Sequence, residues 1–165
     1  MEAAPADLTL IADKNERYRA LHAEVAAVLE GERNMVARYA SAVCLLAQAF
    51  PERFFWTGFY LVDPEKPNEL VVGPYQGTLG CLRIAFGKGV CGTAAAKRAT
   101  QIVEDVHAFP GHIACDSRSN SEIVVPLINK AGALLGVLDV DSTNFAAFDA
   151  VDQRELEAVC SLVAL

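Results

Sequence analysis

Apolar residues recur at every third or fourth position in three stretches of the chain, which is the period of an amphipathic helix. Two of these stretches, residues 14–29 and 35–49, lie near the N-terminus, and Gly31 interrupts the pattern between them. The third covers residues 148–165, where Asp149 is well placed to accept hydrogen bonds from the first backbone amides. We therefore predict two helices at the start of the chain and one that closes it.

The region between these helices has the pattern of short strands. Residues 54–62, FFWTGFYLV, are aromatic and β-branched and stop at the turn signal Asp63-Pro64. A period of two gives this strand two apolar faces, one with Trp56, Gly58, Tyr60 and Val62 and the other with Phe55, Thr57, Phe59 and Leu61. The segment ELVVGPYQG is predicted to pair with it as an antiparallel strand across a turn at residues 64–68.

Further short apolar runs complete the predicted sheet at residues 82–86, 102–103, 122–128 and 133–141. The last two runs, joined by NKAG, predict a hairpin in the middle of the sheet, and the Ala-rich segment 92–98 predicts a short helix. This order of elements predicts an α+β fold in which helices cover one face of an antiparallel sheet.

The chain is expected to form one domain, because no repeat or linker divides it. The expected domain spans residues 1–165, with N-terminal helices at about 14–50, the sheet and its loops at about 54–142 and the C-terminal helix at about 149–165.

Composition and charge exclude several classes of protein. The chain has 165 residues and is 53% hydrophobic, which excludes intrinsic disorder. A net charge of −7, with scattered basic residues, argues against nucleic-acid binding. No apolar run approaches the roughly 20 residues of a membrane span, and the N-terminus MEAAPADLTLIADK lacks the pattern of a secretory signal. Five cysteines, an odd number, indicate a reducing compartment. We therefore expect a soluble, cytoplasmic protein.

The five cysteines fall into two groups. Cys44 and Cys160 lie among apolar residues on predicted helices, where a cysteine usually serves as a small core residue. In contrast, Cys81, Cys91 and Cys115 stand beside turn-forming or polar residues and are expected on loops. Cysteines on loops are exposed to solvent and can react with substrates and reagents.

Three kinds of chemistry would use these loop cysteines. A zinc site built from His107, His112 and Cys115 with Cys81 or Cys91 would be tetrahedral, but its spacing is unlike known zinc ligand runs, so we predict no metal. A Cys-His nucleophile of the hydrolase kind finds no matching local signature. Thiol redox chemistry, in which one cysteine is oxidised to a sulfenic acid and a second resolves it as a disulfide, fits best.

Carboxyl groups accompany the cysteines. Asp139 and Asp141 are two positions apart on a predicted strand and share a face, while Leu138 and Val140 take the opposite face. Glu122 opens the neighbouring strand. Carboxyls held close together raise one another's pKa, which keeps a protonated acid available near neutral pH. The alternative is that these acids belong to a solvated strand end.

Long runs of this sequence resemble one family. RIAFGKGVCGTAA, QIVEDVHAFPGHIACDSRSNSEIVVPL and GVLDVDS, together with FFWTGFYLV and GPYQG, are similar to the free methionine-(R)-sulfoxide reductases, which are built on a single GAF domain. The resemblance extends from about Trp56 to the C-terminal helix. It implies a central antiparallel sheet with helices packed on one face and a ligand pocket on the other. It also suggests a homodimer formed through the helical layer.

The resemblance implies a role for each loop cysteine. Cys115 would be the nucleophile that attacks the sulfoxide of free methionine-(R)-sulfoxide, Cys81 the resolving thiol, and Cys91 a third cysteine that forms or exchanges a disulfide. A thioredoxin-like dithiol would then reduce the disulfide, and no cofactor is needed. The proton for the departing oxygen would come from Glu122, Asp139 or Asp141.

The same resemblance suggests how a free amino acid is held. Trp56 and Tyr60 would wall an apolar slot for the S-methyl group, although they are also suitable as ordinary core aromatics. Asp139, Asp141 or Glu122 would bind the ammonium group, and the turn at residues 87–93 would bind the carboxylate.

The competing hypothesis is a GAF module that senses a small ligand without catalysis. Such modules are usually fused to an output domain, for which 165 residues leave no room, and have no need of three loop cysteines.

Overall fold

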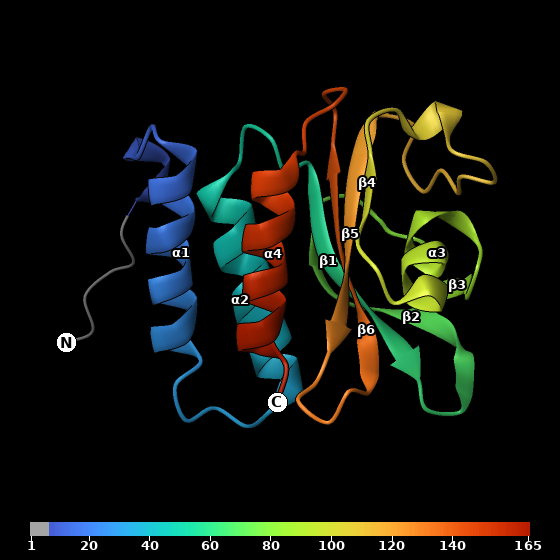
Figure 1. The fold of residues 1–165 in the computed structure, drawn as a ribbon, viewed down its shortest axis with the longest axis horizontal. Helices are drawn as coiled ribbons and strands as arrows, with labels where there is room; N and C mark the ends of the chain where they lie inside the picture. Colours follow the sequence, from blue (N-terminus) through green and yellow to red (C-terminus); the bar gives the residue numbers. More distant parts are fainter. Residues whose placement is uncertain (1–6) are drawn as a thin grey trace.

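In the computed structural model, which describes residues 7–165, three long helices lie on one side of a six-stranded sheet (Figure 1). The elements in chain order are η1 (Leu8–Leu10), α1 (Lys14–Val28), α2 (Met35–Ala49), β1 (Trp56–Asp63), β2 (Lys66–Gln76), β3 (Arg83–Ala85), α3 (Gly89–Lys97), β4 (Gln101–Val103), η2 (Val106–Ala108), β5 (Ser121–Ile128), β6 (Leu134–Ser142) and α4 (Ala150–Val163). The predicted α+β fold is confirmed.

The sheet is antiparallel throughout, in the order β3-β2-β1-β6-β5-β4. Strands β5 and β6 form the predicted hairpin, and β6 also pairs with β1. The predicted turn at residues 64–68 is wrong in length, because Asp63 already pairs with Lys66. The Asp63 side chain accepts a hydrogen bond from the Glu65 backbone amide at 2.9 Å, and this local contact tightens the turn.

The two faces of the sheet carry separate apolar cores. Phe59 belongs to the core beneath α2 and α4, against which α1 packs from outside, whereas Trp56 and Tyr60 lie on the opposite face of the sheet, where the short helix α3 packs (Figure 1). The predicted alternation along β1 is therefore confirmed, with one exception. Phe55 joins the Trp56 side, because it precedes the first residue of β1 and the regular alternation has not yet begun. The Arg118 guanidinium covers its ring at 4.8 Å.

Capping residues set the helix ends in the helical layer. Asp13 caps the start of α1 and Asn34 caps the start of α2, and the side chain of each accepts a hydrogen bond from a backbone amide of the first turn. The predicted cap Asp149 is confirmed, and the Asp152 side chain accepts a hydrogen bond from the Asp149 backbone amide, which completes a capping box. Within residues 7–165, none of the helices has the length and apolar character needed to cross a membrane. The prediction that no targeting signal is present rests partly on residues 1–6, which lie outside the described residues.

A buried arginine ties the helical layer together. Arg38 of α2 is 5% exposed, and its guanidinium donates hydrogen bonds to four backbone carbonyls. Two acceptors, Leu162 and Val163, end α4, and the other two, Leu29 and Glu32, follow α1. One side chain thereby satisfies the carbonyls at two helix ends that have no partner within their own helices.

Candidate active site

A cavity opens on the face of the sheet that the three long helices leave free. Strands β1, β5 and β6 supply its floor, and the start of α3 and the loops around residues 78–80 and 112–119 supply its walls. The space between these walls is about 530 Å³, mouth included. Seven of the eight residues that the sequence nominates line it: Trp56, Tyr60, Cys91, Cys115, Glu122, Asp139 and Asp141.

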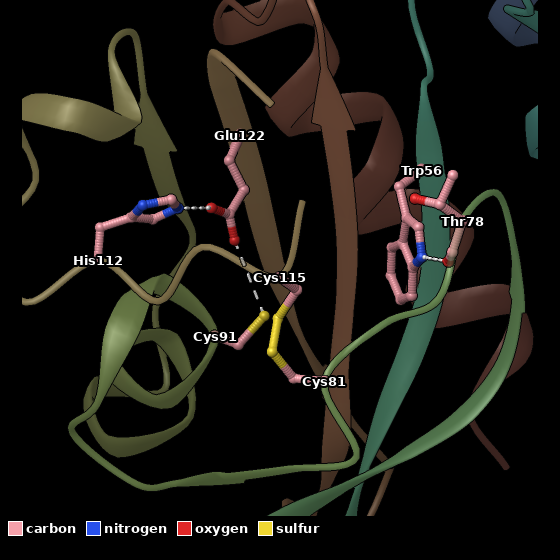
Figure 2. The surroundings of a disulfide bond; sticks show 7 residues. All are labelled: Trp56, Thr78, Cys81, Cys91, His112, Cys115 and Glu122. Atoms are coloured by element: carbon pink, nitrogen blue, oxygen red, sulfur yellow. Dashed lines mark hydrogen bonds and ion pairs between the residues drawn. A yellow bond between two sulfur atoms is a disulfide. The ribbon is translucent and has the colours of Figure 1, made fainter. Parts of the chain in front are cut away.

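The eighth, Cys81, is joined to Cys115 by a disulfide bond at the mouth of this cavity (Figure 2). The two Cα atoms are 5.5 Å apart, within the usual range for disulfides, although 34 residues separate the cysteines in sequence. Cys115 is exposed and Cys81 half-buried. Cys91 lies close by as a free, buried thiol, with its Sγ 3.9 Å from Oε1 of Glu122.

Hydrogen bonds join the two loops that carry the disulfide. The Thr78 hydroxyl donates to Oδ2 of Asp116 at 2.8 Å, which links the Cys81 loop to the residue after Cys115. The Arg118 guanidinium donates to the same carboxylate at 2.7 Å and holds the pKa of Asp116 well below its usual value. Sequence reasoning missed Thr78 and Asp116, because the contact joins segments that are distant in the chain.

Three carboxyl groups meet on the cavity floor. In the register of the sheet, Glu122 on β5 lies opposite Asp141 on β6, and Asp139 is two residues away on the same face. Glu122 is 5% and Asp139 6% exposed, which excludes a solvated strand end for these two acids, whereas Asp141 is half-buried. Oδ1 of Asp139 has no hydrogen-bond partner among the described residues. A buried carboxylate oxygen without a partner is costly, so the site is poised to receive one.

Burial determines the protonation of this cluster. It raises the pKa of Asp139 to about 6, with an opposing contribution from the Cys91 thiol and the Glu122 carboxyl beside it. Burial, with the charge of Asp139 added, raises the pKa of Glu122 and of Asp141 well above the ordinary range. Near neutral pH, Asp139 is therefore the ionised member, and the other two retain protons that they can donate.

The same environment keeps Cys91 protonated. Burial is the main cause that raises the pKa of its thiol, and the charges of Asp139 and Glu122 add to the effect. A buried thiol beside acids is a weak nucleophile, because the thiolate is the reactive form.

His112 is a residue whose position sequence reasoning missed. Its Nε2 lies 3.8 Å from Oε2 of Glu122 (Figure 2), and burial lowers the pKa of the imidazole. His107 instead contacts Oδ1 of Asn120 with its Nε2, at 3.0 Å. The two histidines and Cys115, weighed above as zinc ligands, do not converge as one ligand group among the described residues. His107 and His112 are only five residues apart, and nothing in the local sequence indicates that His112 contacts Glu122 while His107 contacts Asn120.

Aromatic rings form one wall of the cavity. The Trp56 indole stacks on Tyr60 and on Tyr75, with ring centroids 5.6 and 5.1 Å apart. Its Nε1 donates a hydrogen bond to the Thr78 carbonyl at 2.8 Å (Figure 2). Gly58 lies beneath the indole, and a Cβ there would come within 2.6 Å of the ring. The missing side chain of Gly58 is therefore what allows Trp56 to lie flat against the wall.

The start of α3 forms another wall, where the sequence nominates the turn at residues 87–93. Lys88, Gly89 and Val90 line the cavity, and α3 begins at Gly89 with a positive φ of 59°. No side chain caps this helix start. Its first backbone amides are thus available to an anion, and the helix dipole favours negative charge there.

Comparison with known proteins identifies relatives of this chain. A family model described as GAF domain matches residues 40–165. The free methionine-R-sulfoxide reductase of Escherichia coli (strain K12) is 45% identical over 144 residues, 87% of this chain and 84% of that protein. The protein of the same name from Saccharomyces cerevisiae is 44% identical over 137 residues, 81% of this chain and 76% of that one.

Solved structures agree with these matches. The X-ray structure of free methionine-R-sulfoxide reductase from Neisseria meningitidis in complex with its substrate superposes with a TM-score of 0.87 at 46% identity, and the match covers 92% of this chain and 89% of that one.

Proposed function

The chain belongs to the free methionine-R-sulfoxide reductases, oxidoreductases built on the GAF fold, and from this premise we propose that it reduces free methionine-(R)-sulfoxide with its own thiols. The observation that carries the proposal is the Cys81–Cys115 disulfide at the mouth of a cavity with an acidic floor. In this view the structure corresponds to the oxidised product of one turnover, with both electrons already given to the substrate.

The proposed reaction has two steps at the cysteines. The Cys115 thiolate attacks the sulfoxide sulfur, the oxygen passes to Cys115 as a sulfenic acid, and methionine leaves. The Cys81 thiol then attacks the sulfenic sulfur, water departs, and the disulfide forms. Two thiols are oxidised to one disulfide for each sulfoxide reduced.

We assign the proton transfer to the buried acids. The sulfoxide oxygen gains negative charge during attack and needs a donor close by. Glu122 and Asp141 are suited to this role, because burial beside Asp139 raises the pKa of each and keeps them protonated near neutral pH. The negative charge of Asp139 disfavours a thiolate in the same cavity, so binding of the substrate ammonium beside Asp139 would help a thiolate to form.

The walls of the cavity suit the three parts of a free amino acid. Trp56 and Tyr60 offer an apolar surface to the S-methyl group. The unpartnered Oδ1 of Asp139 is suited to the substrate ammonium, and the uncapped start of α3 at Gly89 to the carboxylate. A peptide bond removes the ammonium charge, so this arrangement favours the free amino acid over methionine sulfoxide within a protein.

Recycling requires a dithiol that reaches the disulfide, and we propose a thioredoxin-like protein. Cys115 is exposed, and the exposed apolar side chains of Leu79, Leu82 and Ile113 surround the disulfide loops. Such a rim suits a reductant that docks through a small apolar surface around its own cysteines. The same requirement, together with the free thiols of Cys44, Cys91 and Cys160, supports a cytoplasmic location.

We also propose a homodimer formed through the helical layer. Three large apolar side chains on this side, Leu10, Val28 and Val36, are exposed in the single chain. Light scattering after size-exclusion chromatography tests this proposal: a dimer mass supports it, and a monomer at micromolar concentration refutes it.

A comparison of turnover rates on two substrates tests the proposed specificity. The reduced protein is expected to turn over free methionine-(R)-sulfoxide and to leave the N-acetylated, amidated analogue almost untouched. Comparable rates on the two substrates contradict the proposal. A titration of free thiols before and after one equivalent of substrate separates catalysis from binding, since a sensing module would lose no thiols.

Serine variants separate the two cysteine roles. Cys115→Ser is expected to abolish even a single turnover, because a hydroxyl is a poor nucleophile toward sulfur. Cys81→Ser is expected to release about one methionine per site and to leave a sulfenic acid on Cys115 that dimedone traps. Cys160→Ser is the matched control and should keep full activity, since Cys160 lies in the helical core. A dimedone adduct on Cys81 in place of Cys115 would reverse the assignment.

A further inference from the structure

The floor of the cavity brings together a thiol and two carboxyl groups from three separate elements. Cys91 comes from α3, Glu122 from β5 and Asp139 from β6. One ligand atom of each, the Sγ and one carboxylate oxygen from each acid, lies within 4.8 Å of the others, and all three residues are buried. No other cluster of three such groups occurs among residues 7–165.

The separation between Cys91 and Glu122 is close to the one that a tetrahedral metal imposes on two of its ligands. With Zn–S bonds of about 2.3 Å and Zn–O bonds of about 2.1 Å, the sulfur and oxygen of two ligands are roughly 3.6 Å apart. The observed distance from Cys91 Sγ to Glu122 Oε1 is 3.9 Å. Movements of a few tenths of an ångström in these two side chains therefore complete that edge of the tetrahedron.

One further observation points to a cation at this place, and a second shows which Glu122 oxygen is turned toward it. Oδ1 of Asp139 is buried and has no hydrogen-bond partner among the described residues, although the side chain is only 6% exposed. Next, Nε2 of His112 approaches Oε2 of Glu122, the oxygen that does not face Cys91, at 3.8 Å (Figure 2). This contact is longer than a hydrogen bond, but it places the imidazole beside Oε2, so Oε1 is the Glu122 oxygen that faces Cys91.

We propose that the cavity floor binds a divalent cation of the zinc class, with the Cys91 thiolate, Glu122 and Asp139 as its three protein ligands. The fourth position faces the cavity and is open to water or an added ligand, as in zinc sites with an open position. Binding replaces the thiol proton and any carboxyl proton with metal bonds, so protons are released and affinity rises with pH. A sulfur ligand favours zinc, cobalt or cadmium over magnesium and calcium.

This site goes beyond the proposed reaction, which needs no metal. The cation would lie where Asp139 is proposed to receive the substrate ammonium, so cation and substrate would exclude one another. Sequence spacing does not reveal the site, because its ligands are 31 and 17 residues apart, in no known zinc pattern.

Cobalt binding to the oxidised protein tests the proposal without any turnover. With the Cys81–Cys115 disulfide closed, the remaining thiols are Cys44, Cys91 and Cys160. Titration with Co²⁺ is expected to give one equivalent of binding and a near-ultraviolet charge-transfer band from thiolate to metal. Zn²⁺ in stoichiometric amount should abolish the band, and excess Mg²⁺ should leave it unchanged.

Two variants and one control locate the ligands. Cys91→Ser should lose the band, and Cys160→Ser, which removes the other buried thiol, should keep it. Should Cys91→Ser fail to fold, Asp139→Asn provides the decisive measurement: the band should persist, with a midpoint Co²⁺ concentration at least about tenfold higher.

Three outcomes would overturn the proposal. They are no thiolate band at saturating Co²⁺, a band that survives in folded Cys91→Ser, and a midpoint unchanged by Asp139→Asn. Because the readout is a spectrum, each of these results leaves the proposed reductase activity untouched, and loss of activity alone says nothing about the cation site.

Discussion

Replacing Asp139 by Asn should raise the free energy of unfolding, and this gain should appear only as the pH rises above the acidic range. Burial raises the pKa of this carboxyl from 3.8 to about 6. Between these two values the native state holds a proton that the unfolded chain has already lost. The native state therefore binds more protons, and the free energy of unfolding falls as pH rises through this window. The amide of the Asp139→Asn variant carries no charge, so the variant escapes this loss.

The magnitude follows from the size of the shift. A change of about two pKa units corresponds to about 3 kcal/mol. The variant should match the parent near pH 4 and exceed its unfolding free energy by about 3 kcal/mol near pH 8. For a domain of this size, that difference raises Tm by roughly 6–12 °C. Loss of the Asp139 charge also removes a cause that raises the pKa of Glu122 and of Asp141, which acts in the same direction.

Urea unfolding followed by far-ultraviolet circular dichroism measures this difference at a series of pH values, with the disulfide kept oxidised throughout. Asp149→Asn is the matched control, because a hydrogen bond from Lys14 lowers the pKa of Asp149 to about 2. Relative to the parent, this variant should lose stability as the pH rises above the acidic range, which is the opposite sign. The helix cap itself is kept, because Asn is also a good N-cap residue. A stabilisation by Asp139→Asn that is equal at pH 4 and pH 8, or larger in acid, would refute the reasoning.

Three further predictions concern activity, the pocket wall and the helical layer. Glu122→Gln should lower turnover by about 10² to 10⁴ if it donates the proton, with the fold unchanged by circular dichroism; near-normal rates would contradict this role. Gly58→Ala should displace the Trp56 indole, raise KM and cost about 1–3 kcal/mol. The emission of Trp56, the single tryptophan, should shift, and an unchanged spectrum would count against the packing argument. Arg38→Met leaves four carbonyls without their donor and should cost about 3 kcal/mol or more in urea unfolding; a loss below about 1 kcal/mol would show that water replaces the guanidinium.

Local periodicity was enough to predict the architecture. The helices, the β5–β6 hairpin and the division of β1 into two faces follow from spacings of three to four and of two, which depend on neighbouring residues in the chain. The same rule placed Asp139 and Asp141 on one face and Leu138 and Val140 on the other, as observed. The family resemblance lay in continuous runs of sequence, and the comparisons confirmed it.

The tertiary structure alone decided the chemistry of the cavity floor. The sheet register brings Glu122 opposite Asp141, and the packing of α3 brings Cys91 against Glu122, across 31 residues of chain. Proton affinity depends on how far water is excluded and on which charges lie nearby, and both are properties of the folded surroundings. The sequence therefore names the acids and thiols, whereas the three-dimensional packing determines that Asp139 ionises first, that Cys91 stays protonated and that His112 reaches Glu122.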